Sequence, residues 1–149
     1  MTDLPVTIAD IRRAEKAIAG SISRSPLVRA AALSEMAGCE VWLKLETVHP
    51  TGSFKERGAL NKLLSLTEAE RRAGVIAMSA GNHAQGVAYH ARRLGIPATI
   101  VMPGGTPFTK IDRTEALGAR VLLKGEGLTD AREASEALAR ERGFTMPAV

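Results

Sequence analysis

The spacing of hydrophobic residues becomes regular from residue 74 onward, where short apolar runs alternate with longer amphipathic segments. The runs predict strands at 75–79, 98–102 and 120–124. The segments after them predict helices at 84–94, from about 109 to 117, and at 129–142. A glycine follows the end of each helix, and residues 144–149 have the pattern of a further strand.

Strands that alternate with helices predict an α/β fold with a parallel sheet. These strands are short and almost continuously apolar, which is typical of a sheet covered by helices on both faces. The expected architecture is therefore a three-layer αβα arrangement.

Before residue 74 the pattern is less regular. Residues 7–20 predict a helix, with Thr7 and Asp10 at its start and Ile8, Ile11 and Ile18 as its buried face. Pro26 then favours an extended segment, and residues 31–38 predict a short helix. A strand is predicted at 41–46.

Two capping boxes, each a Ser or Thr followed three residues later by Glu, predict the next helix starts. Ser53 and Glu56 would cap a helix from Phe54 to about Ser65, whose apolar residues are Leu60, Leu63 and Leu64. Thr67 and Glu70 repeat the spacing.

Composition narrows the class of protein. The chain has 149 residues, of which 45% are hydrophobic, enough for a buried core. Aromatic residues are 3%, and the basic residues behind the net charge of +4 are scattered, which argues against nucleic-acid binding. Without an apolar run of signal-peptide or membrane-helix length, a soluble cytoplasmic protein is expected. Cys39, the single cysteine, is expected to be a small buried thiol.

The loop SAGNHAQG, residues 79–86, is the first candidate site because it joins a predicted strand to a predicted helix. Free N–H groups at a helix start suit a carboxylate or phosphate, and Asn82 and His83 add directional hydrogen bonds. An ordinary turn capped by Asn82 is the alternative. PGGTP, residues 103–107, favours a flexible turn.

The three histidines, His49, His83 and His90, do not have the spacing of a metal site, and His90 is expected to be a surface or packed residue.

Lys55 is the second candidate, since it falls in the first turn of a predicted helix, where the helix dipole disfavours an ammonium group. A solvated lysine in a mildly unfavourable position is one interpretation. The other is an amine whose pKa is lowered, next to the apolar Phe54, so that it can form a Schiff base with an aldehyde.

The stretches KLETVHPTGSFKERGA, SAGNHAQGVAYHARRLGIPATIVMP and KIDRTEALGARVLLKG resemble the threonine dehydratase and serine racemase family of pyridoxal-phosphate enzymes. These enzymes have the fold type II, tryptophan synthase beta-like architecture. The resemblance implies that Lys55 holds pyridoxal 5'-phosphate and later moves protons at the substrate α-carbon. It also implies that Phe54 packs near the cofactor ring, that Asn82 hydrogen-bonds the ring hydroxyl, and that the substrate carboxylate is held by Ser79, Ala80, Gly81, Asn82 and His83.

The activity implied by the resemblance is β-elimination from a small amino acid, giving 2-oxobutanoate and ammonia from threonine, and pyruvate from serine. Such an enzyme would serve amino-acid metabolism, including isoleucine biosynthesis, and act as a homo-oligomer in its full-length form. Serine racemases carry a serine where this chain has Ala80, which favours elimination over racemisation. Thr47 and His49 also stand where asparagine and glutamine are common in the family.

Relatives of this kind continue for about another domain. The resemblance implies that residues 1–72 open a larger cofactor domain and that 73–149 form a smaller domain with the carboxylate loop. The glycine-rich loop for the cofactor phosphate has no counterpart in the 149 residues, because PGGTP comes too early. Two alternatives follow: an inactive fragment of such an enzyme, or a related hydroxy-amino-acid dehydratase or racemase.

Overall fold

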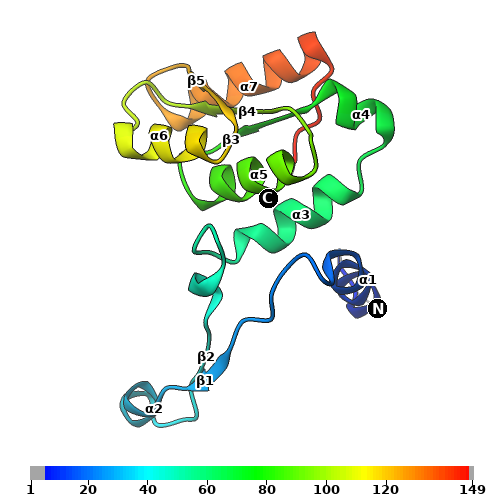
Figure 1. Ribbon diagram of the computed structural model, residues 1–149. Helices are drawn as coiled ribbons and strands as arrows, with labels where there is room; N and C mark the ends of the chain where they lie inside the picture. The colour runs from blue at the N-terminus through cyan, green and yellow to red at the C-terminus, as the bar shows by residue number, and fades with distance from the viewer. Residues whose placement is uncertain (1–5, 148–149) are drawn as a thin grey trace, which may run out of the picture.

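A three-stranded parallel sheet forms the centre of the computed structural model, which describes residues 6–147 (Figure 1). Its strands, in spatial order, are β3 (Val75–Met78), β4 (Ala98–Met102) and β5 (Arg120–Leu123). The parallel register pairs Val75 with Ala98 and Thr99 with Arg120. The three strands predicted after residue 74 are confirmed, with ends within one residue of the expected ones.

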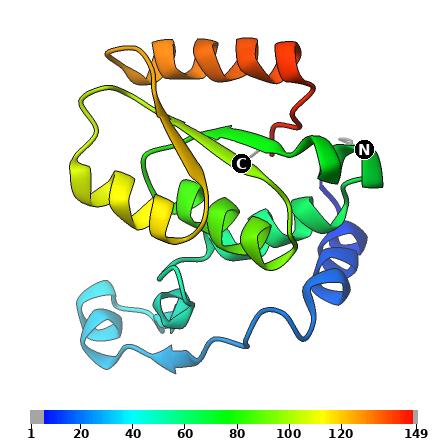
Figure 2. The ribbon, with the colours of Figure 1, turned by 45° about the horizontal axis from the view of Figure 1, so that its top comes forward.

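Helices cover both faces of this sheet, as Figure 2 shows. α5 (Asn82–Arg93) and α6 (Phe108–Ala116) lie on one face, and α7 (Leu128–Arg142) lies on the other. Side chains alternate along β3, so that Val75 and Ala77 join the core under α5 while Ile76 joins the core under α7. The α/β class and its parallel sheet are confirmed. No helix within residues 6–147 has the length and apolar character to cross a bilayer.

The segment after α7 returns to the free edge of β3. Thr145 forms a parallel bridge with Val75, and its carbonyl oxygen accepts a hydrogen bond from the Ile76 N–H at 3.0 Å. The strand predicted at 144–149 is thus present as a single bridge. Its last two residues, 148 and 149, lie outside the described part of the chain.

α3 (Lys55–Leu64) and α4 (Glu68–Ala73) precede the sheet. α3 lies beside α5 in both ribbon views and packs against it with Leu60 and Leu63 buried, while Leu64 is half-buried. The capping box predicted for Thr67 and Glu70 is confirmed at the start of α4.

α1 (Ile8–Ile18) begins with the predicted cap, in which Thr7 and Asp10 form a capping box. Its predicted buried face is wrong for two of three residues, because Ile8 is 63% exposed and Ile11 is 56% exposed. Only Ile18, in the last turn, is buried at 8%. α1 packs against α3, and this contact leaves its first two turns open.

An arm made of residues 27–44 extends from the rest of the molecule (Figure 1). It contains β1 (Leu27–Arg29), α2 (Ala31–Ala37) and β2 (Trp42–Lys44), and a 3₁₀ turn, η1 (Glu46–Val48), follows it. β2 is shorter than the predicted 41–46 and pairs antiparallel with β1, and every residue of this ribbon is exposed. The buried thiol predicted at Cys39 is also wrong: Cys39 is exposed, because it follows the left-handed Gly38 at the end of α2, within the arm.

Candidate active site

The carboxyl end of β3 leads into the loop predicted to hold an anion. Ser79 to Gly81 form the turn, and α5 begins at Asn82 with Gly81 as its N-cap and no side-chain hydrogen bond at the cap. The first N–H groups of a helix have no partner within it, so those of Asn82 and His83 are available to a bound group. They lie at the positive end of the helix dipole, which favours a carboxylate.

Ser79 and Ala80 fix the shape of this turn. The Ser79 N–H donates to the Val101 carbonyl at 3.2 Å and so extends the β3–β4 ladder by one residue. Its hydroxyl oxygen accepts from the Gly81 N–H at 3.2 Å. Ala80 packs against the core under α5. The turn is therefore held by the sheet on one side and by the core on the other.

Lys55 lies in the first turn of α3, as predicted; the helix begins at Lys55, one residue later than expected, and Phe54 is its N-cap. The lysine is half-buried, and its Nζ lies 5.3 Å from the centroid of the exposed Phe54 ring, within range of a cation–π contact.

The capping box predicted for Ser53 and Glu56 is wrong. Ser53 does accept from a helix N–H, but from that of Lys55, at 3.3 Å. The Glu56 carboxylate accepts from the Thr51 N–H at 2.5 Å instead of returning to Ser53. The reason is that α3 begins two residues after Ser53, so Glu56 is its second residue, and the turn closed between His49 and Gly52 leaves the Thr51 N–H within its reach.

Gly86 brings the two candidate stretches together. A Cβ added at Gly86 would lie 3.2 Å from the Lys55 carbonyl carbon, so the backbones of α5 and α3 touch at this point. Asn82, Gly86 and His90 are spaced four residues apart and share one face of α5. The face that meets Lys55 at Gly86 thus carries Asn82 one turn earlier.

His83 lies in the first turn of α5 and is buried, and its Nε2 has no hydrogen-bond partner among residues 6–147. Burial lowers the pKa of His83, and the positive charge of Lys55 lowers it further. His83 is therefore a neutral imidazole near Lys55 at pH 7.

A partly buried polar cluster centred on Glu46 and Arg57 also contacts α3. Arg57 donates to both oxygens of Glu46, at 2.7 and 3.0 Å, and the Ser25 hydroxyl donates to Glu46 at 2.6 Å. The Nε2 of His49 lies 3.0 Å from the same carboxylate. The Arg57 guanidinium is the main reason that the pKa of Glu46 falls to about 2. This cluster joins the end of the arm to the helix that carries Lys55.

His90 is the packed residue that the sequence allowed, since its side chain is fully buried in the interface between α5 and α3. Its Nε2 lies 3.4 Å from a Glu56 carboxylate oxygen. Burial lowers the pKa of His90, and the Glu56 charge opposes this shift only in part. Sequence reasoning missed the pair, although a glycine and a histidine one turn apart on an apolar helix were a visible signal.

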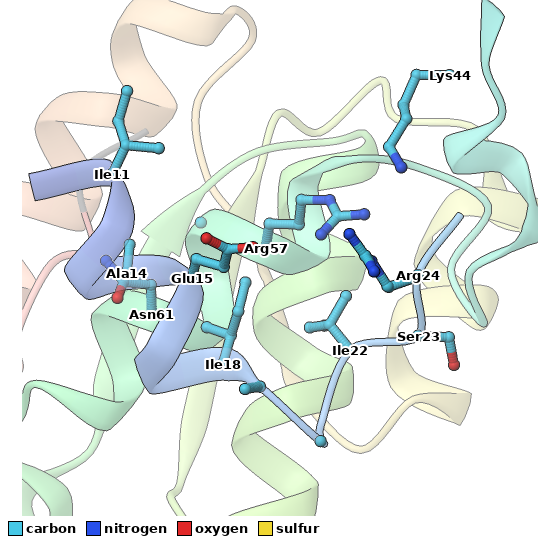
Figure 3. A pocket seen from close by; sticks show the side chains of 13 residues that line it. Ile11, Ala14, Glu15, Ile18, Ile22, Ser23, Arg24, Lys44, Arg57 and Asn61 are labelled. Atoms are coloured by element: carbon cyan, nitrogen blue, oxygen red, sulfur yellow. The ribbon is translucent and has the colours of Figure 1, made fainter. Parts of the chain in front are cut away.

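A cavity of about 850 Å³ lies between α1, the segment after it and α3 (Figure 3). Apolar side chains of Ile11, Ile18 and Ile22 and basic side chains of Arg24, Lys44 and Arg57 are among its lining. Neither Lys55 nor any residue of 79–83 borders it, so this cavity is separate from the candidate site.

Residues 18–149 match the family described as pyridoxal-phosphate dependent enzyme, and the chain belongs to that family. Among curated proteins, it is 47% identical over 138 residues to the L-threonine ammonia-lyase of Thermotoga maritima. That alignment covers 93% of this chain but 34% of the relative.

Solved structures agree on the fold. Maize serine racemase superposes with a TM-score of 0.89 at 30% identity, covering 97% of this chain and 44% of that one. The processed form of threonine deaminase isoform 2 from Solanum lycopersicum superposes with a TM-score of 0.83 at 36% identity, covering 95% of this chain and 40% of that one. The architecture is thus that of the fold type II enzymes, and the chain spans less than half the length of the proteins it resembles.

Proposed function

We propose that this chain provides the lysine and the carboxylate loop of a pyridoxal-phosphate site for β-elimination from L-threonine, and from serine as a second substrate. The observation behind this proposal is the contact at Gly86, which sets the backbone of Lys55 against the helix whose N-terminus is uncapped. An amine and an anion site brought together in this way suit an α-amino acid substrate.

The described residues fit pyridoxal phosphate at its reactive end. The half-buried Lys55 amine can bond to the cofactor aldehyde, and Asn82 can hydrogen-bond the ring hydroxyl from the same face of α5. Phe54 can pack against the ring. When bound, the cofactor supplies an electron sink for the α-carbon.

The other roles in the proposal belong to the chain itself. The N–H groups of Asn82 and His83 hold the substrate carboxylate, within the turn formed by Ser79, Ala80 and Gly81. Once the substrate amine has displaced Lys55 from the cofactor aldehyde, the freed Lys55 amine would take the proton from the α-carbon.

Ala80 supports elimination over racemisation. Racemisation requires a proton donor on each face of the α-carbon, and a methyl group neither donates nor accepts a proton. A relative named L-threonine ammonia-lyase is consistent with this preference.

For the longer protein, we propose that residues 1–72 belong to the larger cofactor domain and 73–149 to the smaller one, in a homo-oligomer. The similar proteins are more than twice as long as the stretch aligned here. Residues beyond this stretch would then hold the cofactor phosphate.

The first experiment tests Lys55 directly. Pyridoxal phosphate is added to the 149-residue chain, the adduct is reduced with borohydride, and peptides are mapped by mass spectrometry. Lys55 is expected to be modified well ahead of exposed lysines such as Lys110, and Lys55→Ala should abolish the visible absorbance band. Equal modification of all lysines would contradict the proposal.

The second experiment tests the reaction. Release of oxo acid from threonine, serine and other β-hydroxy amino acids is measured with the 149-residue chain. Weak turnover or none is expected from this chain, because an unanchored cofactor phosphate forfeits binding energy. Rapid turnover by this chain alone would contradict the inactive-fragment alternative, and racemisation without oxo acid would contradict elimination.

A further inference from the structure

We propose that Glu56, held between Thr51 and His90, is a positioning residue that fixes the start of α3 and thereby the Lys55 amine. This inference rests on the proposed function of Lys55 and adds a residue to which that function gives no role. The starting observation is that a carboxylate only 1% exposed directly follows the candidate lysine.

The two oxygens of Glu56 reach in different directions. One accepts from the Thr51 N–H at 2.5 Å, and the other lies 3.4 Å from Nε2 of His90. Thr51 belongs to the turn before α3, whereas His90 belongs to α5. The Glu56 side chain therefore connects the turn that precedes α3 with α5.

The other hydrogen bonds of the turn between His49 and Lys55 join residues close together in the sequence. The His49 carbonyl accepts from the Gly52 N–H at 2.7 Å, and Gly52 has a positive φ of 70°. The Ser53 hydroxyl accepts from the Lys55 N–H at 3.3 Å. Glu56 is the group that links this turn to α5, across the interface in which Gly86 touches Lys55.

Energetics favour a positioning role. Removing a carboxylate from water is costly, and apolar replacements of buried ion pairs are often neutral or stabilising. Stability alone is thus a weak reason for a glutamate at this position. Geometry gives a stronger reason. Consecutive residues of a helix point about 100° apart, so when Glu56 points into the interior, Lys55 points toward the more open side of α3.

The test compares Glu56→Ala, Glu56→Asp and Glu56→Gln with the unaltered chain, and with Glu133→Ala on the exposed side of α7 as a control. Two quantities are measured: amide hydrogen exchange by mass spectrometry, and borohydride-trapped pyridoxal phosphate on Lys55. Glu56→Asp keeps the charge but is too short to reach Thr51 and His90 together, and it provides the comparison if Glu56→Ala does not fold.

In Glu56→Ala and Glu56→Asp, exchange in 51–57 is expected to be roughly tenfold faster, as for the loss of a hydrogen bond to a charged acceptor. The yield of the trapped Lys55 adduct should fall severalfold, while the amides of β3 and β4 keep their protection from hydrogen exchange. Glu56→Gln should restore both readouts, because its amide oxygen can accept the same N–H.

Unchanged exchange in 51–57 would overturn the proposal, as would faster exchange spread equally over β3 and β4. It would also be overturned if exchange increased while the Lys55 adduct stayed constant, because the turn would then not position the lysine. Absence of any Lys55 adduct in the unaltered chain would count against the proposed function instead, and the exchange data would still decide whether Glu56 holds the turn.

Discussion

At the scale of single residues, the candidate active site depends on the absence of a side chain at Gly86. The backbones of α3 and α5 can touch only because Gly86 lacks a side chain, and this contact sets Lys55 beside the start of α5. Glycine costs a helix about 1 kcal/mol relative to alanine, so its presence in the middle of α5 is explained by close approach and not by helix stability.

Gly86→Ala is therefore expected to destabilise the protein, despite the better helix propensity of alanine. The new Cβ would lie 3.2 to 3.4 Å from backbone atoms of Lys55 and Glu56, and such crowding costs about 1–3 kcal/mol against a gain of about 1 kcal/mol. Urea unfolding measures the difference. Gly58→Ala is the matched control: nothing lies within 4 Å of its added Cβ, and it should stabilise α3 by about 0.5–1 kcal/mol. Stabilisation by both substitutions would contradict this account.

At the scale of elements, α3 is held on two sides by carboxylates, the buried Glu56 and the partly buried Glu46. Glu56 connects its first turn to α5, and Glu46 connects Arg57 to the residues that flank the arm. Packing of apolar faces alone would permit α3 to slide or rotate. The Glu56 hydrogen bond to Thr51, its 3.4 Å contact with His90 and the Glu46 hydrogen bonds to Arg57 define its position more closely. The helix that carries Lys55 is thus more tightly specified than its hydrophobic pattern indicates.

Glu46→Gln should lower stability at neutral pH by about 1–2 kcal/mol, because the partly exposed Arg57 loses a charged acceptor. The pKa of Glu46 lies at about 2 in the fold, below its ordinary value of 4.5, so folding favours the ionised form. The stabilisation is present above about pH 4.5 and disappears as the pH falls toward 2. Urea unfolding of both proteins across that range should show the difference shrinking.

Glu68→Gln is the control for this experiment, since Glu68 forms an exposed ion pair with Arg72 at 3.4 Å. Its effect should stay within about 0.5 kcal/mol. A Glu46→Gln difference that did not change with pH would show that the lost contacts do not depend on the carboxylate charge.

At the scale of the whole molecule, the chain combines a well-packed body with a poorly covered arm. The body is organised around β3, β4 and α5, whose side chains include many that are fully buried. The arm exposes large apolar side chains, among them Met36 and Trp42, and two-stranded ribbons are only marginally stable in water. Such apolar surface favours association with other protein surfaces.

Amide hydrogen exchange of the 149-residue chain should therefore be fastest in the arm. Amides of β1 and β2 are expected to exchange through local opening, whereas those of β3 and β4 exchange only when the whole body unfolds. Because local opening costs much less free energy than global unfolding, exchange in β1 and β2 should be roughly 100-fold or more faster. Mass spectrometry of peptides from 27–44 and 75–102 measures both in one experiment. Equal protection of the two regions would show that the arm is stabilised by contacts that its exposure does not indicate.

Much of the fold was predictable because its signals are local. Apolar runs and terminal glycines placed the strands and helices after residue 74. The Thr7 cap and the Thr67–Glu70 capping box were read from side chains three residues apart, whereas the box predicted for Ser53 and Glu56 was wrong. Periodicity failed where burial depends on a partner: Ile8 and Ile11 share a helical stripe with Ile18, yet only Ile18 is buried. The prediction of a buried Cys39 failed for the same reason, because the sequence around Cys39 does not indicate that the arm extends into solvent.

By itself, the sequence determined the family, the alternation of strands and helices, and the position of Lys55 in the first turn of a helix. Only the tertiary structure decided what that lysine lies against. The contact at Gly86, the Glu56–His90 pair and the Glu46 cluster join residues distant in sequence, and such residues meet only when the elements that carry them pack together. Local propensity acts within a few residues, whereas the distances and burial that define a site arise from packing.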